Sequence, residues 1–218
     1  MRIVAVADTH LYHGDLVVPD GDVFVHAGDL CRGGDLRELG IAAAWLQSLP
    51  HAVKIVVAGN HDRALQTSPA AAITVLGEGV TYLQDAGTCI DGVRFWGSPW
   101  QPAYHDWAFN LPRGAALAER WAWIPEGTDV LITHGPPFGI GDAISVRDRH
   151  GCADLLARVE AIRPKLHLFG HIHTDGGLWR KGETVFANVT TWECERGVTV
   201  VDVDSGTVRA VSVPPRAI

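Results

Sequence analysis

Five short apolar runs recur along the chain, and each one ends in a polar cluster that contains His, Asp or Asn. The runs are residues 2–7, 22–27, 53–58, 129–133 and 165–169. Runs this short and this apolar are typical of strands that are buried on both faces. Because the carboxyl ends of strands in such folds open onto one crevice, the five polar clusters are expected to converge on a single site.

Segments with a helical pattern separate these runs. Residues 35–49 repeat apolar side chains at a helical period, and Pro50 ends the pattern. Residues 113–124 and 153–162 are two further predicted helices. The alternation of buried strands and helices predicts an α/β fold.

Beyond residue 182 the chain has the pattern of strands alone. Strands are predicted at residues 184–188, 197–204 and 207–213, and a turn at 204–206 predicts that the last two strands form a hairpin. These segments are expected to build a second, mostly antiparallel sheet. The expected architecture is therefore a layered α/β sandwich.

Charge and composition exclude several classes of protein. The 18 Lys and Arg against 25 Asp and Glu give a net charge of −7, and without basic clusters a long nucleic acid is not an expected partner. No apolar stretch approaches the ~20 residues of a membrane helix, and no signal-type region opens the chain, so no membrane partner is expected. The 4 cysteines lack a CxxC pair, which favours reduced thiols and a cytoplasmic protein. A length of 218 residues suits a single domain spanning residues 1–218.

The polar clusters supply seven candidate metal ligands, with oxygen and nitrogen donors and no thiolate. They are Asp8, His10, Asp29, Asn60, His134, His171 and His173. Such a set suits two metal ions about 3.5–4 Å apart if one carboxylate bridges them. Mixed His and carboxylate ligation fits transition metals better than Ca or Mg, so manganese is expected, with Fe, Zn, Co and Ni as alternatives.

Three other histidines lie near the clusters. His26 and His167 fall inside strands just before two of the motifs, where a hydrogen bond beside the site is expected instead of metal binding. His13 is close enough in sequence to the first cluster to border the pocket.

The five clusters, in chain order, are DTH at 8–10, GD at 28–29, GNHD at 59–62, THG at 133–135 and GHIH at 170–173. Together they resemble the motifs of the calcineurin-like metallophosphoesterase superfamily. The stretches HAGDLCRGG, KIVVAGNHD and PKLHLFGHIH also resemble the MPPED subfamily of metallophosphodiesterases. The resemblance implies a layered α/β/β/α sandwich of two mixed sheets flanked by helices, which is the calcineurin-like phosphoesterase fold.

The resemblance also implies a role for each residue of the motifs. The ligands of one metal ion would be Asp8, His10, Asp29 and His173, and those of the other Asp29, Asn60, His134 and His171. A hydroxide bridging the two ions would be the nucleophile. His61 would be the catalytic histidine that assists the leaving group, and Asp62 would orient its imidazole.

The segment of residues 97–113 is the expected substrate loop, because its aromatic side chains stand among Pro, Gly and Asn. The side chains concerned are Trp100, Trp107, Phe109, Asn110 and Arg113. The aromatic side chains could stack on a base or aryl group, and the amide and guanidinium could bind phosphate or sugar oxygens. Packing of the aromatic side chains beneath the loop is the alternative.

The resemblance favours hydrolysis of a small phosphodiester, such as a cyclic nucleotide. A phosphomonoesterase or phosphoprotein phosphatase could use the same ligands; protein phosphatases of the superfamily usually add arginines, and only Arg32, Arg63 and Arg113 stand near the motifs. A non-catalytic scaffold and a nuclease of short oligonucleotides are further alternatives. The expected partner is a small phosphoester, with a nucleotide as one candidate, and the oligomeric state stays open.

Overall fold

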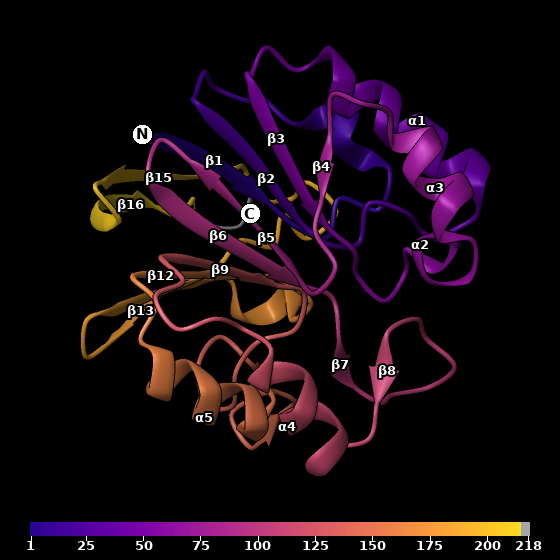
Figure 1. Ribbon diagram of the computed structural model, residues 1–218. Helices are drawn as coiled ribbons and strands as arrows, with labels where there is room; N and C mark the ends of the chain where they lie inside the picture. Colours follow the sequence, from indigo (N-terminus) through magenta and orange to yellow (C-terminus); the bar gives the residue numbers. More distant parts are fainter. Residues whose placement is uncertain (215–218) are drawn as a thin grey trace.

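Two six-stranded sheets lie face to face, and helices cover their outer faces (Figure 1). The computed structural model describes residues 1–214. The first sheet has the strand order β16-β15-β1-β2-β3-β4, and the second has the order β13-β14-β12-β9-β6-β5. Both sheets are mixed, so the predicted α/β/β/α sandwich of two mixed sheets is confirmed.

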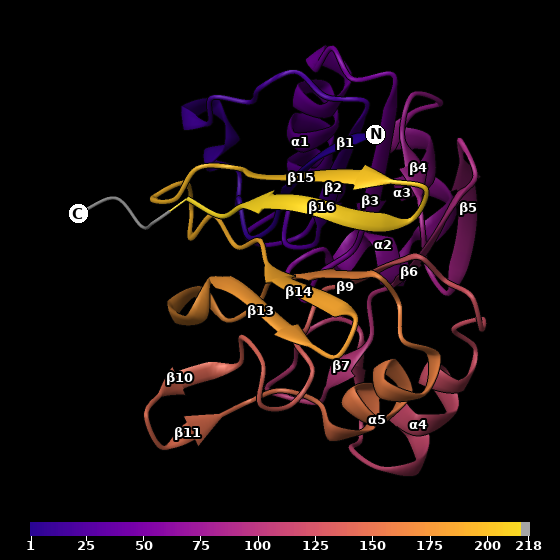
Figure 2. The ribbon, with the colours of Figure 1, turned by 90° about the vertical axis from the view of Figure 1, so that its left-hand side faces the viewer.

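The first sheet combines parallel strands from the amino-terminal half with a hairpin from the end of the described chain. Its strands are β1 (Arg2–Val6), β2 (Val23–Ala27), β3 (Val53–Val57), β4 (Thr81–Tyr82), β15 (Thr199–Asp204) and β16 (Thr207–Ser212). The first four run parallel, and β15 joins β1 antiparallel. Ser205 and Gly206 have positive φ angles, which suit the tight turn of the predicted β15–β16 hairpin (Figure 2).

The second sheet has a parallel centre and antiparallel edges. Its strands are β5 (Ala86–Ile90), β6 (Val93–Ser98), β9 (Val130–Thr133), β12 (Leu166–Phe169), β13 (Gly177–Lys181) and β14 (Thr184–Asn188). The prediction of a mostly antiparallel second sheet is therefore wrong. Strand β14 pairs parallel with β12, whereas the β15–β16 hairpin crosses to the first sheet. Long-range pairing, which the local pattern does not encode, decides this division.

Helices pack on both outer faces and confirm the three that the sequence predicts. On the first sheet lie α1 (Leu36–Ser48), α2 (Arg63–Thr67) and α3 (Pro69–Leu76), and on the second lie α4 (Ala115–Ala122) and α5 (Ala153–Ile162). Asp35 caps α1 by accepting a hydrogen bond from the Glu38 N–H. Among residues 1–214, no helix is long and apolar enough to cross a membrane.

Apolar side chains from both sheets fill the space between them. In β1, Ile3 and Ala5 belong to this central core, while Val4 and Val6 pack with the helices on the outer face. All four are fully buried. Burial on both faces explains why the strand sequences are apolar throughout. It also stabilises the sheets that hold the site, since each large aliphatic side chain contributes ~1.5–3 kcal/mol when buried.

Short elements outside the two sheets surround the edge where the polar clusters lie. They are the 3-10 turns η1 (Tyr12–Asp15) and η2 (His173–Asp175), the bridge of β7 (Gln101–Pro102) with β8 (Asn110–Leu111), and the hairpin of β10 (Ala143–Ser145) with β11 (Asp148–Arg149). The β10–β11 hairpin stands out from the body of the molecule (Figure 2). It is tied to η2, because the Ala143 N–H donates to the Asp175 carboxylate over 2.9 Å.

Candidate metal centre

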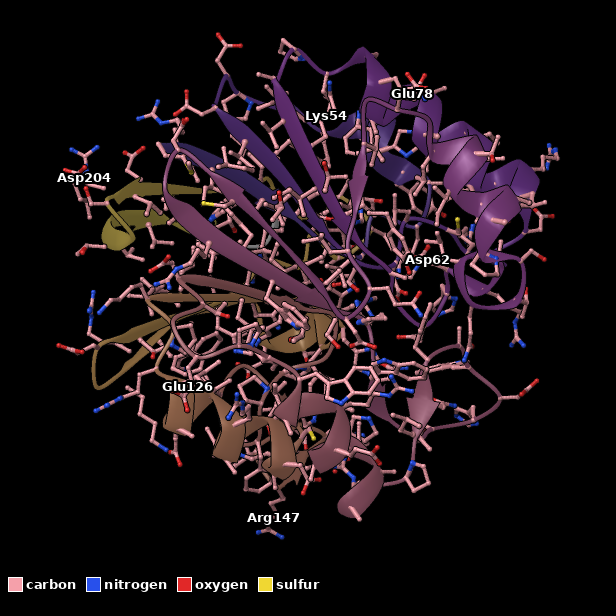
Figure 3. All side chains as sticks on the ribbon, in the orientation of Figure 1. Lys54, Asp62, Glu78, Glu126, Arg147 and Asp204 are labelled. Carbon is pink, nitrogen blue, oxygen red and sulfur yellow. The ribbon has the colours of Figure 1, made fainter. Side chains whose placement is uncertain are left out.

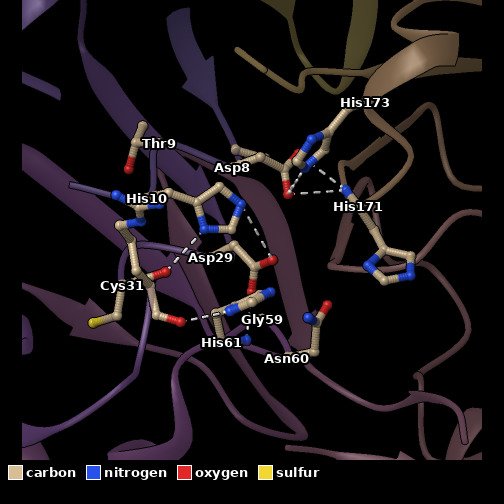
Figure 4. A network of polar contacts seen from close by, with 12 residues as sticks. Asp8, Thr9, His10, Asp29, Cys31, Gly59, Asn60, His61, His171 and His173 are labelled. Carbon is tan, nitrogen blue, oxygen red and sulfur yellow. Dashed lines mark hydrogen bonds and ion pairs between the residues drawn. The ribbon is translucent and has the colours of Figure 1, made fainter. Parts of the chain in front are cut away.

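The structure brings all seven predicted ligands to one place at the carboxyl ends of β1, β2, β3, β9 and β12 (Figure 4). Their ligand atoms form groups within 4.8 Å: Asp8, His10 and His173 in one, and Asp29, His134 and His171 in another. Asn60 joins the second group, because its Oδ1 lies 2.9 Å from His134 Nε2. The predicted convergence of the five motifs is therefore a feature of the structure.

Asp29 stands between the two groups. Its Oδ2 lies 3.8 Å from His10 Nε2, which belongs to the first group, and 3.3 Å from His134 Nε2, which belongs to the second. Its Oδ1 accepts a hydrogen bond of 2.7 Å from the His61 N–H. One oxygen of this carboxylate therefore faces both groups, a position that suits a bridging ligand.

Backbone carbonyls fix the orientation of two ligand rings. His10 Nδ1 lies 2.9 Å from the Cys31 carbonyl oxygen, and His134 Nδ1 lies 2.9 Å from the Ala27 carbonyl oxygen. A ring that donates from Nδ1 leaves Nε2 with its lone pair for a metal ion. The buried Cys31 thiol belongs to an apolar cluster instead, and burial raises its pKa.

The electrostatics of the cluster favour a positive charge at its centre. Burial opposes ionisation of Asp8 and Asp29, yet the neighbouring histidines outweigh it and lower the pKa of both carboxyl groups. Burial also works against a charge on His134, but Asp29 and Asp8 raise its pKa to about 9. The two buried carboxylates thus stabilise a positive charge on a buried imidazole. A divalent cation bound among the same side chains would meet the same negative charge. The residues present therefore fit a metal site.

Four of the seven ligands adopt the left-handed backbone region, which is uncommon outside glycine. They are Asp8, His10, Asp29 and His171, with φ of 57°, 43°, 59° and 71°. Each follows a buried strand directly or within a few residues. Such conformations cost of order 1–3 kcal/mol each and cluster at functional sites. The chain therefore adopts this conformation at four of the places where it turns sharply to present a predicted ligand.

Gly28 is needed because the loops of three ligands meet there. Its φ is 100°, and a Cβ on it would lie 2.4 Å from His134 Nδ1 and 2.8 Å from the Gly59 Cα. We expect Gly28→Ala to displace His134 from its carbonyl partner and to weaken metal binding by about 10–100-fold, measured by titration of the metal-free protein with Mn²⁺. Gly14→Ala is the matched control, because a Cβ there meets nothing within 4 Å. Equal metal affinity in both variants would contradict this prediction.

Asp62 does not orient the imidazole of His61, so that prediction is wrong. Its buried carboxylate accepts hydrogen bonds from the backbone N–H groups of Asp29, Cys31 and Gly59, at 2.9, 3.0 and 2.8 Å. Figure 3 shows Asp62 in the interior, in contrast to labelled surface residues such as Glu78. Burial, followed by the Asp29 carboxylate, raises the pKa of Asp62 to about 6. Asp62 therefore joins two ligand-bearing loops to each other.

His61 is held by a different partner. Its Nδ1 lies 2.6 Å from the Arg32 carbonyl oxygen, which leaves Nε2 available (Figure 4). The imidazole is half-buried and meets the His10 ring edge-on at 4.9 Å between centroids. A ring nitrogen of His61 also lies within 4.8 Å of ligand atoms of His10 and Asp29. The position suits either a group that acts on the substrate or an additional ligand.

Two of the side chains predicted to contact substrate have partners within the protein. Trp100 donates from Nε1 to Asp85 over 2.7 Å, and the Arg120 guanidinium lies 4.6 Å from the centre of its ring. Asn110 donates to the carbonyl groups of Tyr104 and His105 over 3.1 and 3.0 Å, so it closes its own loop. Neither side chain lines the cavity beside His171, and their contact with a substrate stays a prediction.

The other predicted side chains of the substrate loop divide between the pocket and the core. Arg113 lines a cavity beside His171, but its guanidinium donates to the His150 and Gly151 carbonyls. Trp107 places its ring 5.6 Å from the His61 ring and 5.9 Å from the His171 ring. Phe109 is fully buried. Of the predicted aromatic contacts, Trp107 alone stands beside the metal ligands.

Trp192 is a neighbour of the site that the sequence patterns miss. Its ring centroid lies 6.2 Å from that of His173, and the next residue, Glu193, donates its N–H to the Asp8 carbonyl. Trp192, Glu193 and Cys194 all have positive φ. The signal was present: a polar cluster, Thr190-Thr191-Trp192, follows the apolar run of β14 as the motifs follow theirs.

Two histidines inside strands support the site as expected. His26 Nε2 lies 3.0 Å from the Thr9 hydroxyl, and His167 Nε2 lies 2.9 Å from the Thr133 hydroxyl. Thr9 directly precedes His10, and Thr133 directly precedes His134, so both hydrogen-bonded pairs help to hold a motif in place. His13 does not border the cavity beside His171; it stacks on Trp45 of α1 at 4.7 Å between ring centroids.

Two mixed sheets that present a cluster of histidines and carboxylates at their carboxyl edge fit a metal-dependent hydrolase. The sequence model described as Calcineurin-like phosphoesterase matches residues 1–175, and the chain belongs to this family. Its members use divalent metal ions, and the candidate groups described above would hold them here.

Relatives and solved structures agree with this assignment. The chain is 40% identical over 213 residues to human metallophosphoesterase domain-containing protein 1, with 87% of this chain and 65% of the human protein covered. A UPF0046 protein of Caenorhabditis elegans is 39% identical over 213 residues, covering 90% of this chain and 71% of that protein. The chain thus spans 65% of the human relative's length.

Among solved structures, the protein TT1561 of Thermus thermophilus superposes with a TM-score of 0.66 at 13% identity, covering 97% of this chain and 98% of that one. A putative 5'-nucleotidase from Staphylococcus aureus gives a TM-score of 0.61 at 14% identity, covering 99% of this chain and 54% of that one. At these identities the likeness supports the fold alone.

Proposed function

We propose that this protein is a binuclear metal-dependent hydrolase of small phosphodiesters. The observation that carries the proposal is the position of Asp29 Oδ2, 3.8 Å from His10 Nε2 and 3.3 Å from His134 Nε2. A carboxylate oxygen that faces both ligand groups supports a site for two metal ions close together. The ions would supply Lewis acidity to the phosphoryl oxygens and a means of activating water.

The two ligand groups divide the seven residues between two ions. One ion would be held by Asp8, His10, Asp29 and His173, and the other by Asp29, Asn60, His134 and His171. Mixed imidazole and carboxylate ligation suits transition metals better than Ca or Mg, so manganese is the proposed metal, with Fe, Zn, Co and Ni as alternatives. Two divalent ions exceed the charge of the two carboxylates, so the site attracts an anion without basic side chains.

The arginines near the motifs support a diester substrate over a monoester. Arg32 donates to the Tyr12 hydroxyl over 3.1 Å, Arg63 pairs with Asp106, and Arg113 donates to two carbonyl groups. A phosphomonoester is largely a dianion at neutral pH, whereas a phosphodiester carries one negative charge. A site in which all three guanidinium groups are engaged elsewhere suits the less charged substrate.

His61 is the residue proposed to act on the leaving group. Its Nδ1 is bound to the Arg32 carbonyl, so Nε2 is the nitrogen that can exchange a proton with the substrate. The half-buried ring stands beside the ligand His10. Protonation of the departing oxygen by a positioned imidazole is a common form of general acid catalysis.

The proposed substrate is a small molecule, and the proposed location is the cytoplasm. The net charge of −7 offers no extended basic surface for a long nucleic acid. All four cysteines are free, and two of them, Cys31 and Cys152, are buried, which supports a reducing compartment.

The proposal is tested by comparing bis(4-nitrophenyl) phosphate with 4-nitrophenyl phosphate in the presence of Mn²⁺. We expect kcat/KM for the diester to exceed that for the monoester by about tenfold or more, and a chelator to abolish both activities. The two substrates release the same product, so the ratio reports the ester class. A preference for the monoester would contradict the diester proposal.

A further inference from the structure

A cavity of about 160 Å³ opens directly beside the metal ligands. The side chains that define it include Tyr104, Trp107, Arg113, Pro136, Ile144 and His171. His171 belongs to the second ligand group, so the cavity and the proposed metal site share a wall. A substrate whose phosphate is bound by the ions would therefore place one of its ester groups at this opening.

Aromatic rings form one continuous wall of the cavity. The Trp107 ring meets the His171 ring edge-on at 5.9 Å and the Tyr104 ring at 5.2 Å between centroids. Ile144 of β10 and Pro136 also line the cavity. Aromatic rings pack favourably edge-on at these separations. A further ring inserted into the cavity would make the same kind of contact with Trp107 or Tyr104.

Hydrogen bonds within the protein hold the lining of the cavity in place without a ligand. Asn110 binds the carbonyl groups of Tyr104 and His105, which closes the loop that carries the aromatic wall. Arg113 donates to the His150 and Gly151 carbonyls, which ties that loop to the segment that follows the β10–β11 hairpin. These contacts make the cavity preformed, and preorganisation reduces the entropy lost on binding.

Two polar side chains of the cavity lining, Arg113 and His150, already have partners within the protein. The Arg113 guanidinium is bound to two carbonyl groups, and His150 Nε2 lies 3.0 Å from the Asp148 carboxylate. The protein itself therefore holds both side chains in place, without a ligand. A neutral ring matches the aromatic and aliphatic walls better than a charged group does.

We propose that this cavity binds a single aromatic ring carried on one ester group of the substrate, with Trp107 and Tyr104 as the specificity-determining residues. The volume supports one ring, because a cavity of about 150 Å³ accommodates benzene. This inference rests on the proposed function, since the ions must hold the phosphate while the ring enters the cavity.

Binding of two phosphonates to the manganese-loaded protein tests the proposal without turnover. Phenylphosphonate and methylphosphonate both offer a phosphonate to the metals, but only the first carries a ring. We expect calorimetry to show phenylphosphonate binding about tenfold or more tightly. In Trp107→Leu the preference should fall below about threefold, and Trp107→Phe should restore most of it.

Trp123→Leu is the matched tryptophan control, because Trp123 is 49% exposed and stacks on Arg120 outside the cavity. It should keep the full preference. Tyr104→Leu provides a second variant whose side chain contacts none of the proposed ligands directly, and it should also reduce the preference. Equal binding of the two phosphonates by the unaltered protein would overturn the inference, as would an unchanged preference in both variants. Failure of both phosphonates to bind, together with no diester hydrolysis, would instead overturn the proposed function on which the inference rests.

Discussion

Asp29→Ala is expected to remove both metal ions and to reduce hydrolysis to background. The Oδ2 atom of Asp29 stands between His10 Nε2 and His134 Nε2, so each ion would lose its shared ligand at once. The substitution also removes the acceptor of the His61 N–H. The measurements are metal content of the purified protein by elemental analysis and turnover of bis(4-nitrophenyl) phosphate.

Two further variants test whether the negative charge of Asp29 matters, and whether its position in the site matters. Asp29→Asn keeps an acceptor for the His61 N–H but lacks the negative charge, and it too should lose metal. Asp204→Ala removes an exposed carboxylate far from the site on the surface of the molecule, and it should retain both ions and full activity (Figure 3). If Asp29→Ala kept two ions, the bridging role would be refuted.

The ligand cluster could be predicted because the direction of each strand largely determines where the residue that follows it lies. Asp29 closely follows β2, and His134 directly follows β9, each a buried parallel strand whose carboxyl end is fixed by its direction. Residues far apart in the chain therefore meet without any detailed knowledge of loops. The short apolar runs identified the strands, and the parallel pairing of those strands brought their ends together.

The directions of the side chains in the substrate loop could not be predicted, because they depend on partners elsewhere in the chain. Trp100 turns toward Asp85 and Arg120, which come from a strand edge and a helix that the loop's own sequence does not reveal. Asn110 folds back onto Tyr104 because β7 and β8 pair there. The composition of residues 97–113 identified a loop with aromatic side chains, but tertiary contacts determine which of them face the site.

The pair His61-Asp62 illustrates a different limit. Adjacency in the motif suggested that one side chain orients the other. The backbone instead sends the two in separate directions, to the Arg32 carbonyl and to the amides of the Asp29 and Gly59 loops. Neighbouring residues at a sharp turn rarely face each other, so sequence proximity was the wrong guide to contact.

His61→Ala is expected to keep both metal ions and to lower turnover by ~10²–10⁴-fold. The backbone N–H of residue 61 donates to Asp29 Oδ1 whatever the side chain, so the bridging carboxylate keeps its support in the variant. What the variant loses is the imidazole, whose Nε2 is left available by the bond between Nδ1 and the Arg32 carbonyl. Metal content and turnover are measured on the same preparation.

The loss of turnover in His61→Ala can be compared between substrates with different leaving groups. This comparison distinguishes the two roles proposed for His61. An imidazole that protonates the departing oxygen matters most for a poor leaving group, so a diester that releases an alkoxide should suffer a larger loss than one that releases 4-nitrophenolate. If His61 acted only by stabilising charge on the phosphoryl group, both substrates would lose activity equally. His61, His10 and Asp29 also form a candidate ligand group of their own. A variant that lost metal along with activity would therefore place His61 among the ligands, and retention of metal with a leaving-group-dependent loss would place it at the departing oxygen.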